Sequence, residues 1–101
     1  MPGDSIYDPY HQHYGNWPIT SGKAQIQAWS SGQSVGYAQG ILHYTFGQSN
    51  TVAQLPGPWN FDVATVNAVI NLQNWAGLPA TGVVNAATWG VIDWAAAGFP
   101  T

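Results

Sequence analysis

Very few side chains in this sequence could carry out acid–base chemistry. Among its 101 residues the only charged side chains are Lys23, Asp4, Asp8, Asp62 and Asp93. Glycoside hydrolysis requires two carboxyl groups about 5 to 10 Å apart, but two of these acids lie near the N-terminus and Asp62 is expected to cap a helix. The chain also lacks a Gly-x-Ser-x-Gly elbow, a Cys/His pair and a His-Glu-x-x-His zinc helix. The sequence therefore predicts that the protein is not an enzyme and has no catalytic residues.

A metal site could be built most readily near the N-terminus, where Asp8, His11 and His13 lie close together in sequence. Carboxylate and imidazole groups are common metal ligands. The same spacing suits an exposed turn equally well, and no further ligands are evident. Cysteine is absent, so thiolate sites and disulfides are ruled out. We therefore expect no metal and no cofactor.

Charge is scarce throughout the chain, at 5% of residues, against about 25% in ordinary soluble domains. Phosphate groups and anionic lipids are bound through Lys and Arg, so nucleic acid and membrane surfaces are poor candidate partners. No apolar run approaches the ~18 residues of a membrane-spanning helix. Residues 1–10 lack the basic and apolar regions of a signal peptide. We expect such a protein to leave a cell by lysis or as a piece of a longer product.

Neutral polar and aromatic groups are what the sequence offers for binding. Sugars and short peptides are held by aromatic faces and by Asn, Gln, Ser and Thr side chains. The aromatic content of 14%, with six Trp, exceeds what a small core can bury, so some rings should be exposed. The candidate ligand-binding residues are Trp59, Asn71, Gln73, Asn74, Trp75 and Asn85.

Two capped helices are expected to position these groups. Asp62 is placed as the N-cap of the first, which ends at Gly77, because apolar residues recur there at helical spacing. Asn85 is placed as the N-cap of the second, which stops at 98–100, and an extended pair at 83–84 lies between them. The predicted buried faces are Ala68, Val69, Leu72 and Ala76 on the first helix and Thr88, Val91, Ile92 and Ala95 on the second, with Asn67, Asn71 and Asn74 on another face of the first.

A third helix is predicted from Val35 to about Thr45, with Ser34 as its cap and with Val35, Ala38, Leu42 and Thr45 on its predicted buried face. Gly36 and Gly40 lie inside it, each costing about 1 kcal/mol relative to alanine. Such costs suggest that a ring or another backbone crosses closely at this ridge. The ring could be Trp29 or Trp59 of the same chain, or a partner's surface could lie there. Residues 25–29 alternate weakly and predict a short strand or an irregular extended piece.

Residues 1–20 form an arm rich in aromatic residues, proline and glycine, and residues 21–101 form the expected domain. The mixture breaks periodic structure while keeping large apolar side chains. The arm could pack along its own domain or dock on a partner. Its candidate partner-binding residues are Tyr7, Tyr10, Tyr14 and Trp17.

An ordered series of residues in the second half resembles the small peptidoglycan-binding domain of cell-wall hydrolases and phage endolysins. That family reads F-G-x-x-T-x-x-A-V-x-x-F-Q, then G-L, G-x-V and T-W. The matching residues are Phe61, Thr65, Ala68, Val69, Leu72, Gln73, Gly77, Leu78, Gly82, Val83, Val84, Thr88, Trp89 and Ile92, with a weaker match at Gly32, Val35, Ala38, Gln39 and Leu42. One departure is Asp62, where the family has glycine.

The resemblance implies a mainly α fold, a compact three-helix bundle, here with an extended N-terminal arm. It also implies that Trp89 packs the core and that Gln73 either ties helix to loop or touches ligand. The function expected is a non-catalytic module that attaches its carrier to bacterial cell wall, with peptidoglycan or another wall glycan as partner. The alternative is a structural protein of a phage particle, a capsid decoration or tail component that contacts virion subunits. The location expected is extracellular or wall-associated, or the virion.

Overall fold

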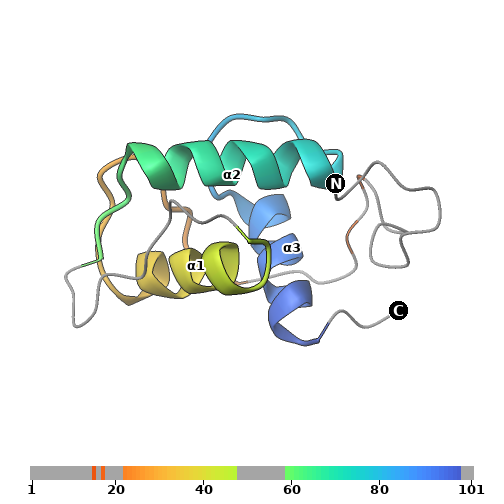
Figure 1. The fold of residues 1–101 in the computed structure, drawn as a ribbon, viewed down its shortest axis with the longest axis horizontal. Helices are drawn as coiled ribbons and strands as arrows, with labels where there is room; N and C mark the ends of the chain where they lie inside the picture. The colour runs from red at the N-terminus through yellow and green to blue at the C-terminus, as the bar shows by residue number, and fades with distance from the viewer. Residues whose placement is uncertain (1–14, 16, 18–21, 48–58, 99–101) are drawn as a thin grey trace.

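Three helices make up the regular structure of the part of the chain that the computed structural model describes, which is residues 15, 17, 22–47 and 59–98. They are α1 (Gln33–Tyr44), α2 (Val63–Ala76) and α3 (Ala86–Ala96). The first helix contacts both of the others, and in Figure 1 α3 starts between α1 and α2 and runs past the end of α1 at a steep angle to both. The described residues contain no strand, only two isolated antiparallel bridges. The mainly α, three-helix prediction is confirmed, while Tyr7, Tyr10, Tyr14 and the possible ligands Asp8, His11 and His13 lie outside the described residues.

Helix α2 begins and ends where the sequence predicts. The Asp62 carboxylate accepts hydrogen bonds from the backbone N–H of Thr65 at 3.0 Å and from its hydroxyl at 2.7 Å. At the other end Gly77 adopts a left-handed conformation with φ 76°, and the N–H of Leu78 donates back to the carbonyl of Gln73 at 2.9 Å. Both ends are therefore satisfied by local groups, as helix ends require.

Helix α3 repeats the same capping device. The side-chain oxygen of Asn85 accepts from the backbone N–H of Thr88 at 3.0 Å and from its hydroxyl at 2.9 Å. The helix ends at Ala96, and Gly98 follows with a φ of 92°. Each helix of this pair thus starts from an Asx residue three positions before a buried threonine, which is an arrangement set by sequence alone.

Helix α1 begins earlier than predicted, and the expected Ser34 cap is wrong. Its N-cap is Gly32, which has a φ of 108° and no side-chain capping bond. Before the helix, Ser31 forms an antiparallel bridge with Asn60, and the N–H of Gly32 donates to the carbonyl of Trp59 at 3.1 Å. This long-range pairing fixes the direction of the chain, and glycine allows the sharp turn into the helix. Ser34 consequently falls in the first turn.

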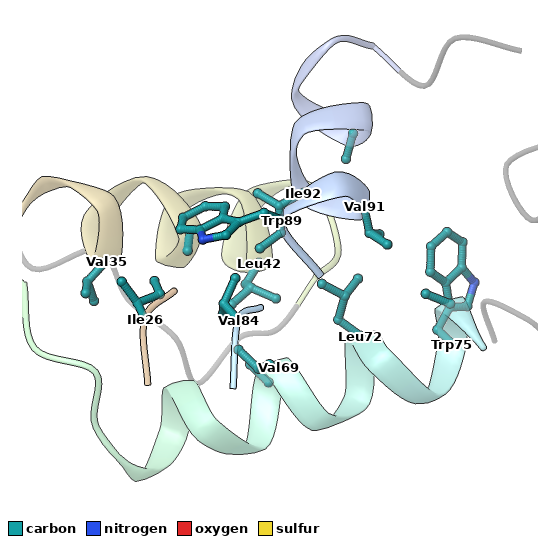
Figure 2. Close-up of a cluster of buried hydrophobic side chains, with 14 of the residues drawn as sticks. Ile26, Val35, Leu42, Val69, Leu72, Trp75, Val84, Trp89, Val91 and Ile92 are labelled. Carbon is teal, nitrogen blue, oxygen red and sulfur yellow. The ribbon is translucent and has the colours of Figure 1, made fainter. Parts of the chain in front are cut away.

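The core lies between the helices and is closed by two extended segments. Ile26 and Val84 form the second bridge through hydrogen bonds of 3.2 and 2.9 Å, and Figure 2 shows their side chains between α1 and α2. The chain is therefore extended around Ile26 without forming a strand, and residues 28–29 lie in a turn. Of the predicted faces only Thr45 is not buried, because it is half-buried at the end of α1. The other residues of these faces are buried: Val35, Ala38, Leu42, Ala68, Val69, Leu72, Ala76, Thr88, Val91, Ile92 and Ala95.

Candidate functional site

The exposed polar face of α2 carries the asparagine residues that the sequence placed there. Asn67, Asn71 and Asn74 are all exposed. Residues three and four positions apart are neighbours on a helix surface, so Asn71 lies beside Asn67 and Asn74. Each amide offers both donors and acceptors without charge. This row can therefore bind hydroxyl and amide groups of a neutral ligand.

Gln73 is turned away from that face and is fully buried. Its Nε2 donates to the carbonyl of Val83 at 2.9 Å and to the hydroxyl of Thr88 at 3.0 Å, and its Oε1 accepts from the N–H of Gly82 at 3.0 Å. The buried amide thus connects α2, the turn before α3 and the first turn of α3. Of the two roles left open for Gln73, the tie between helix and loop is the one observed.

Trp75 was expected to be exposed, and that expectation is wrong because its side chain is only 8% exposed. Its ring lies 5.4 Å from Trp17, 5.4 Å from Phe46 and 6.4 Å from Trp94, measured between ring centroids. These aromatic partners come from the arm, the end of α1 and α3. The last turn of α2 is covered from three sides, which the periodicity of α2 alone does not show.

Trp17 packs on its own domain. The ring lies 4.7 Å from Trp94, and its Nε1 donates to the carbonyl of Ala76 at 2.9 Å. The N–H of Gly15 donates to the same carbonyl at 2.7 Å. Of the two roles left open for the arm, this contact corresponds to packing along its own domain.

Trp59 and Asn85 complete the set of candidate ligand-binding residues, and both have structural contacts. Trp59 is half-buried and lies against Gly36 of α1, so the prediction that a ring of the same chain crosses this ridge is confirmed. Asn85 is used as the cap of α3. The six candidates therefore do not converge on one surface, and only Asn71 and Asn74 are exposed.

Three exposed aromatic rings are not among the predicted ligand-binding residues. Trp29 is 72% exposed, Tyr44 is 76% exposed and Tyr37 is 37% exposed. The sequence did offer a signal for Trp29, because it stands directly before Ser30, Ser31 and Gly32, a run typical of a surface turn. Trp89, by contrast, is fully buried, as the family resemblance implied.

Lys23, the only basic side chain of the sequence, belongs to a charged and aromatic cluster that links the first extended segment with α1 and α3. Its Nζ lies 3.0 Å from the carboxylate of Asp93, 5.0 Å from the ring centroid of Tyr37 and 5.5 Å from that of Trp89. The hydroxyl of Tyr37 donates to the carboxylate of Asp93 at 3.1 Å. The rings of Tyr37 and Trp89 are stacked, with their centroids 6.2 Å apart. The Trp89 Nε1 donates to the carbonyl of Ala24 at 2.9 Å.

This environment changes the acidity of Tyr37. Partial burial, the hydrogen bond to Asp93 and the negative charge of that carboxylate all raise the pKa of the Tyr37 phenol above its ordinary value of 10.0. Each effect favours the neutral phenol over the phenolate. Tyr37 is therefore a hydrogen-bond donor at neutral pH. The cluster connects the first extended segment, α1 and α3.

Groups of three or more potential metal ligands do not occur among the described residues. In the same part of the chain, no helix has the length and apolar character needed to span a membrane. The side chains available for ligand contact in this part of the chain are therefore neutral amides and aromatic rings, with one small charged cluster around Lys23.

A small three-helix domain with exposed amides and aromatic rings has the groups needed to bind a neutral polar ligand. Comparison with known families identifies it further: residues 32–92 match the model of a family described as a peptidoglycan binding domain. The matched segment contains α1, α2 and the first part of α3 and covers more than half of the chain, so the protein belongs to this family. No curated protein and no solved structure matches the chain.

Proposed function

We propose that this domain is a non-catalytic module that binds peptidoglycan and thereby attaches its carrier to the bacterial cell wall. The observation that carries the proposal is the family match over residues 32–92, which begins at the N-cap of α1 and ends within α3. Residues of the family pattern such as Phe61, Trp89 and Ile92 are buried in the core. A location at the cell wall follows from this function.

The chemistry of the exposed α2 face supports the same function. Peptidoglycan presents hydroxyl groups, acetamido groups and peptide bonds, which neutral amides recognise through paired donors and acceptors. Asn71 and Asn74 are the candidate residues in position to do so. We assign ligand contact to these two because they are exposed, and leave out Gln73, Trp75, Asn85 and Trp59, which are buried or half-buried.

Sedimentation with insoluble, purified peptidoglycan tests the proposal directly. The protein should co-sediment with peptidoglycan and remain in solution with cellulose, an insoluble glycan without acetamido groups or peptides. Binding through neutral groups should change little between about 0.05 and 1 M salt, a range over which interactions between exposed charges are progressively screened. A protein that stays in solution, or whose retention disappears at high salt, would contradict neutral recognition of peptidoglycan.

The residue assignment has a separate test. Replacing Asn71 and Asn74 together by alanine should weaken retention about tenfold, since each lost hydrogen bond contributes about 0.5–1.5 kcal/mol. Gln33→Ala is the matched control, because it removes another exposed amide from a different helix. Equal retention of the double variant and the control would show that the α2 face is not the binding surface.

The alternative role as a structural subunit of a phage particle has no described contact in its favour. Trp17 is the one arm ring whose surroundings are described, and it packs on its own domain. Co-sedimentation with peptidoglycan also distinguishes the two functions. A subunit that contacts only virion proteins should not bind peptidoglycan and should remain in solution.

A further inference from the structure

Trp29 combines two features that ordinary packing does not explain. Its side chain is 72% exposed, although an indole ring gains most from burial. Its backbone has a φ of 70°, and it is the only residue other than glycine with a positive φ among those the structure describes. Bulky side chains rarely adopt this conformation because the Cβ atom crowds the backbone. A strained residue that gains little burial in return is a candidate for function.

The surrounding turn holds Trp29 in this conformation. The N–H of Ser30 donates to the carbonyl of Gln27 at 2.8 Å, and the Ser30 hydroxyl accepts from the N–H of Gln27 at 3.0 Å. The N–H of Trp29 itself donates to the carbonyl of Phe61 at 2.8 Å, and the N–H of Phe61 donates to the carbonyl of Ser30 at 2.8 Å. Because Phe61 is fully buried, the turn is anchored to the core. The indole is therefore displayed on a fixed support.

The polar groups beside Trp29 in the chain are neutral. Gln25 and Gln27 are exposed and joined by a side-chain hydrogen bond of 3.1 Å. Exposed Asn60 is brought to the same region through its bridge with Ser31. A flat apolar ring beside amide donors and acceptors suits a ligand with one apolar face and polar edges. A pyranose ring has this character, because its axial C–H groups form one face and its hydroxyl and acetamido groups lie at the rim.

We infer that Trp29 is a stacking platform for a sugar ring of the cell-wall glycan. The inference rests on the proposed function and deepens it, because it assigns part of the recognition to the glycan strand rather than to the stem peptide. Trp29 lies outside the matched segment of residues 32–92, so this contact is additional to the family pattern. It places a ligand contact immediately before α1, apart from the asparagine row of α2.

The test compares three variants of the full chain. Trp29→Gly removes the ring and also the strain, since glycine adopts a positive φ freely. Trp29→Tyr keeps an aromatic face. Tyr44→Ala is the matched control, because Tyr44 is equally exposed but stands at the far end of α1, a helix about 17 Å long. Each variant is assayed for retention on intact peptidoglycan, for retention on glycan strands freed of stem peptides, and for its thermal midpoint.

We expect Trp29→Gly to weaken binding without lowering stability. Trp29→Gly should keep or raise the thermal midpoint while weakening retention on both materials about tenfold, the loss typical of an aromatic anchor. Trp29→Tyr should retain most of the binding, and Tyr44→Ala should bind like the wild type. If the wild type binds intact peptidoglycan and Trp29→Gly binds equally well, the inference is overturned while the proposed function stands. If the wild type binds neither material, the proposed function itself fails, and the inference fails with it.

Discussion

Trp59 lies so close to the backbone of Gly36 that a Cβ atom at this position would be 2.6 Å from Cδ2 of the indole ring. The half-buried ring lies across the first turn of α1. Trp59 directly precedes Asn60, which forms a bridge with Ser31 just before the helix. Gly40, one turn further on, has no comparable neighbour, because nothing lies within 4 Å of a Cβ built there. The close approach predicted from both glycines is therefore present at the first and absent at the second.

The different surroundings of Gly36 and Gly40 predict that alanine has opposite effects on stability at the two positions. Gly36→Ala should lower the free energy of unfolding by about 1–3 kcal/mol, because the new methyl group meets the Trp59 ring. Gly40→Ala should raise it by about 0.5–1 kcal/mol, because alanine is the better helix former and the space is open. Urea unfolding of both variants measures the effects. A Gly36→Ala protein as stable as Gly40→Ala would mean that Trp59 moves aside without cost.

The buried amide of Gln73 predicts a large effect at one position and a small effect beside it. Gln73→Ala removes the partners of Gly82 N–H and the Val83 carbonyl and opens a cavity, so stability should fall by about 2–4 kcal/mol. Asn74→Ala changes an exposed amide next to it and should stay within about 0.5 kcal/mol of the wild type. Chemical denaturation followed by far-ultraviolet circular dichroism separates the two. Similar losses in both variants would argue against the central role of Gln73.

The raised pKa of Tyr37 predicts a loss of stability at alkaline pH. In the unfolded chain Tyr37 loses its proton near its ordinary pKa of 10.0, whereas the folded protein holds the proton to higher pH. Between the two values the unfolded state binds fewer protons, so the free energy of unfolding falls as pH rises. The stabilisation is complete below the ordinary value and is lost as pH passes the raised one.

Tyr37→Phe isolates this effect because it keeps the ring beside Trp89 and removes the hydroxyl. The stability advantage of the wild type over the variant should shrink on going from pH 8 to about pH 11. Urea midpoints across this range give the comparison, and two curves that stay parallel would show that Tyr37 titrates alike in the folded and unfolded states.

The contact of Trp17 with the domain predicts that the arm contributes to stability. Trp17→Ala removes a half-buried ring and its hydrogen bond to Ala76, so the free energy of unfolding should fall by about 2 kcal/mol. Trp17→Phe keeps a ring and should lie between that variant and the wild type. Thermal unfolding and amide exchange at the end of α2 provide the measurements. Unchanged protection of the last turn of α2 in Trp17→Ala would show that the arm does not stabilise it.

The helices could be predicted because their signals are local. Asp62 and Asn85 each cap a helix through a threonine three positions later, and Gly77 ends α2 by its own conformational freedom. The start of α1 was misplaced because Gly32 depends on pairing with residues 59 and 60, far along the chain. Signals that require a distant partner are invisible in a local window of sequence.

The candidate site was harder to predict for the same reason. Asn71 and Asn74 are exposed as expected, since helical periodicity alone determines their face. Trp75 is covered by Trp17, whose hydrogen bond to Ala76 spans 59 positions of sequence. The turn signal after Trp29 indicates an exposed position, but its positive φ has no recognisable signal in the sequence. Composition correctly indicated exposed rings, but it could not say which ones.

The three indole rings of Trp17, Trp75 and Trp94, with centroids 4.7 to 6.4 Å apart, have an optical consequence. Transition dipoles at such separations couple, so the cluster should produce an exciton signature in the circular dichroism spectrum. Lifting the arm would remove one oscillator from the coupled set while the helices remain folded. The native protein thus contains its own spectroscopic reporter of arm docking, with no need for an attached dye.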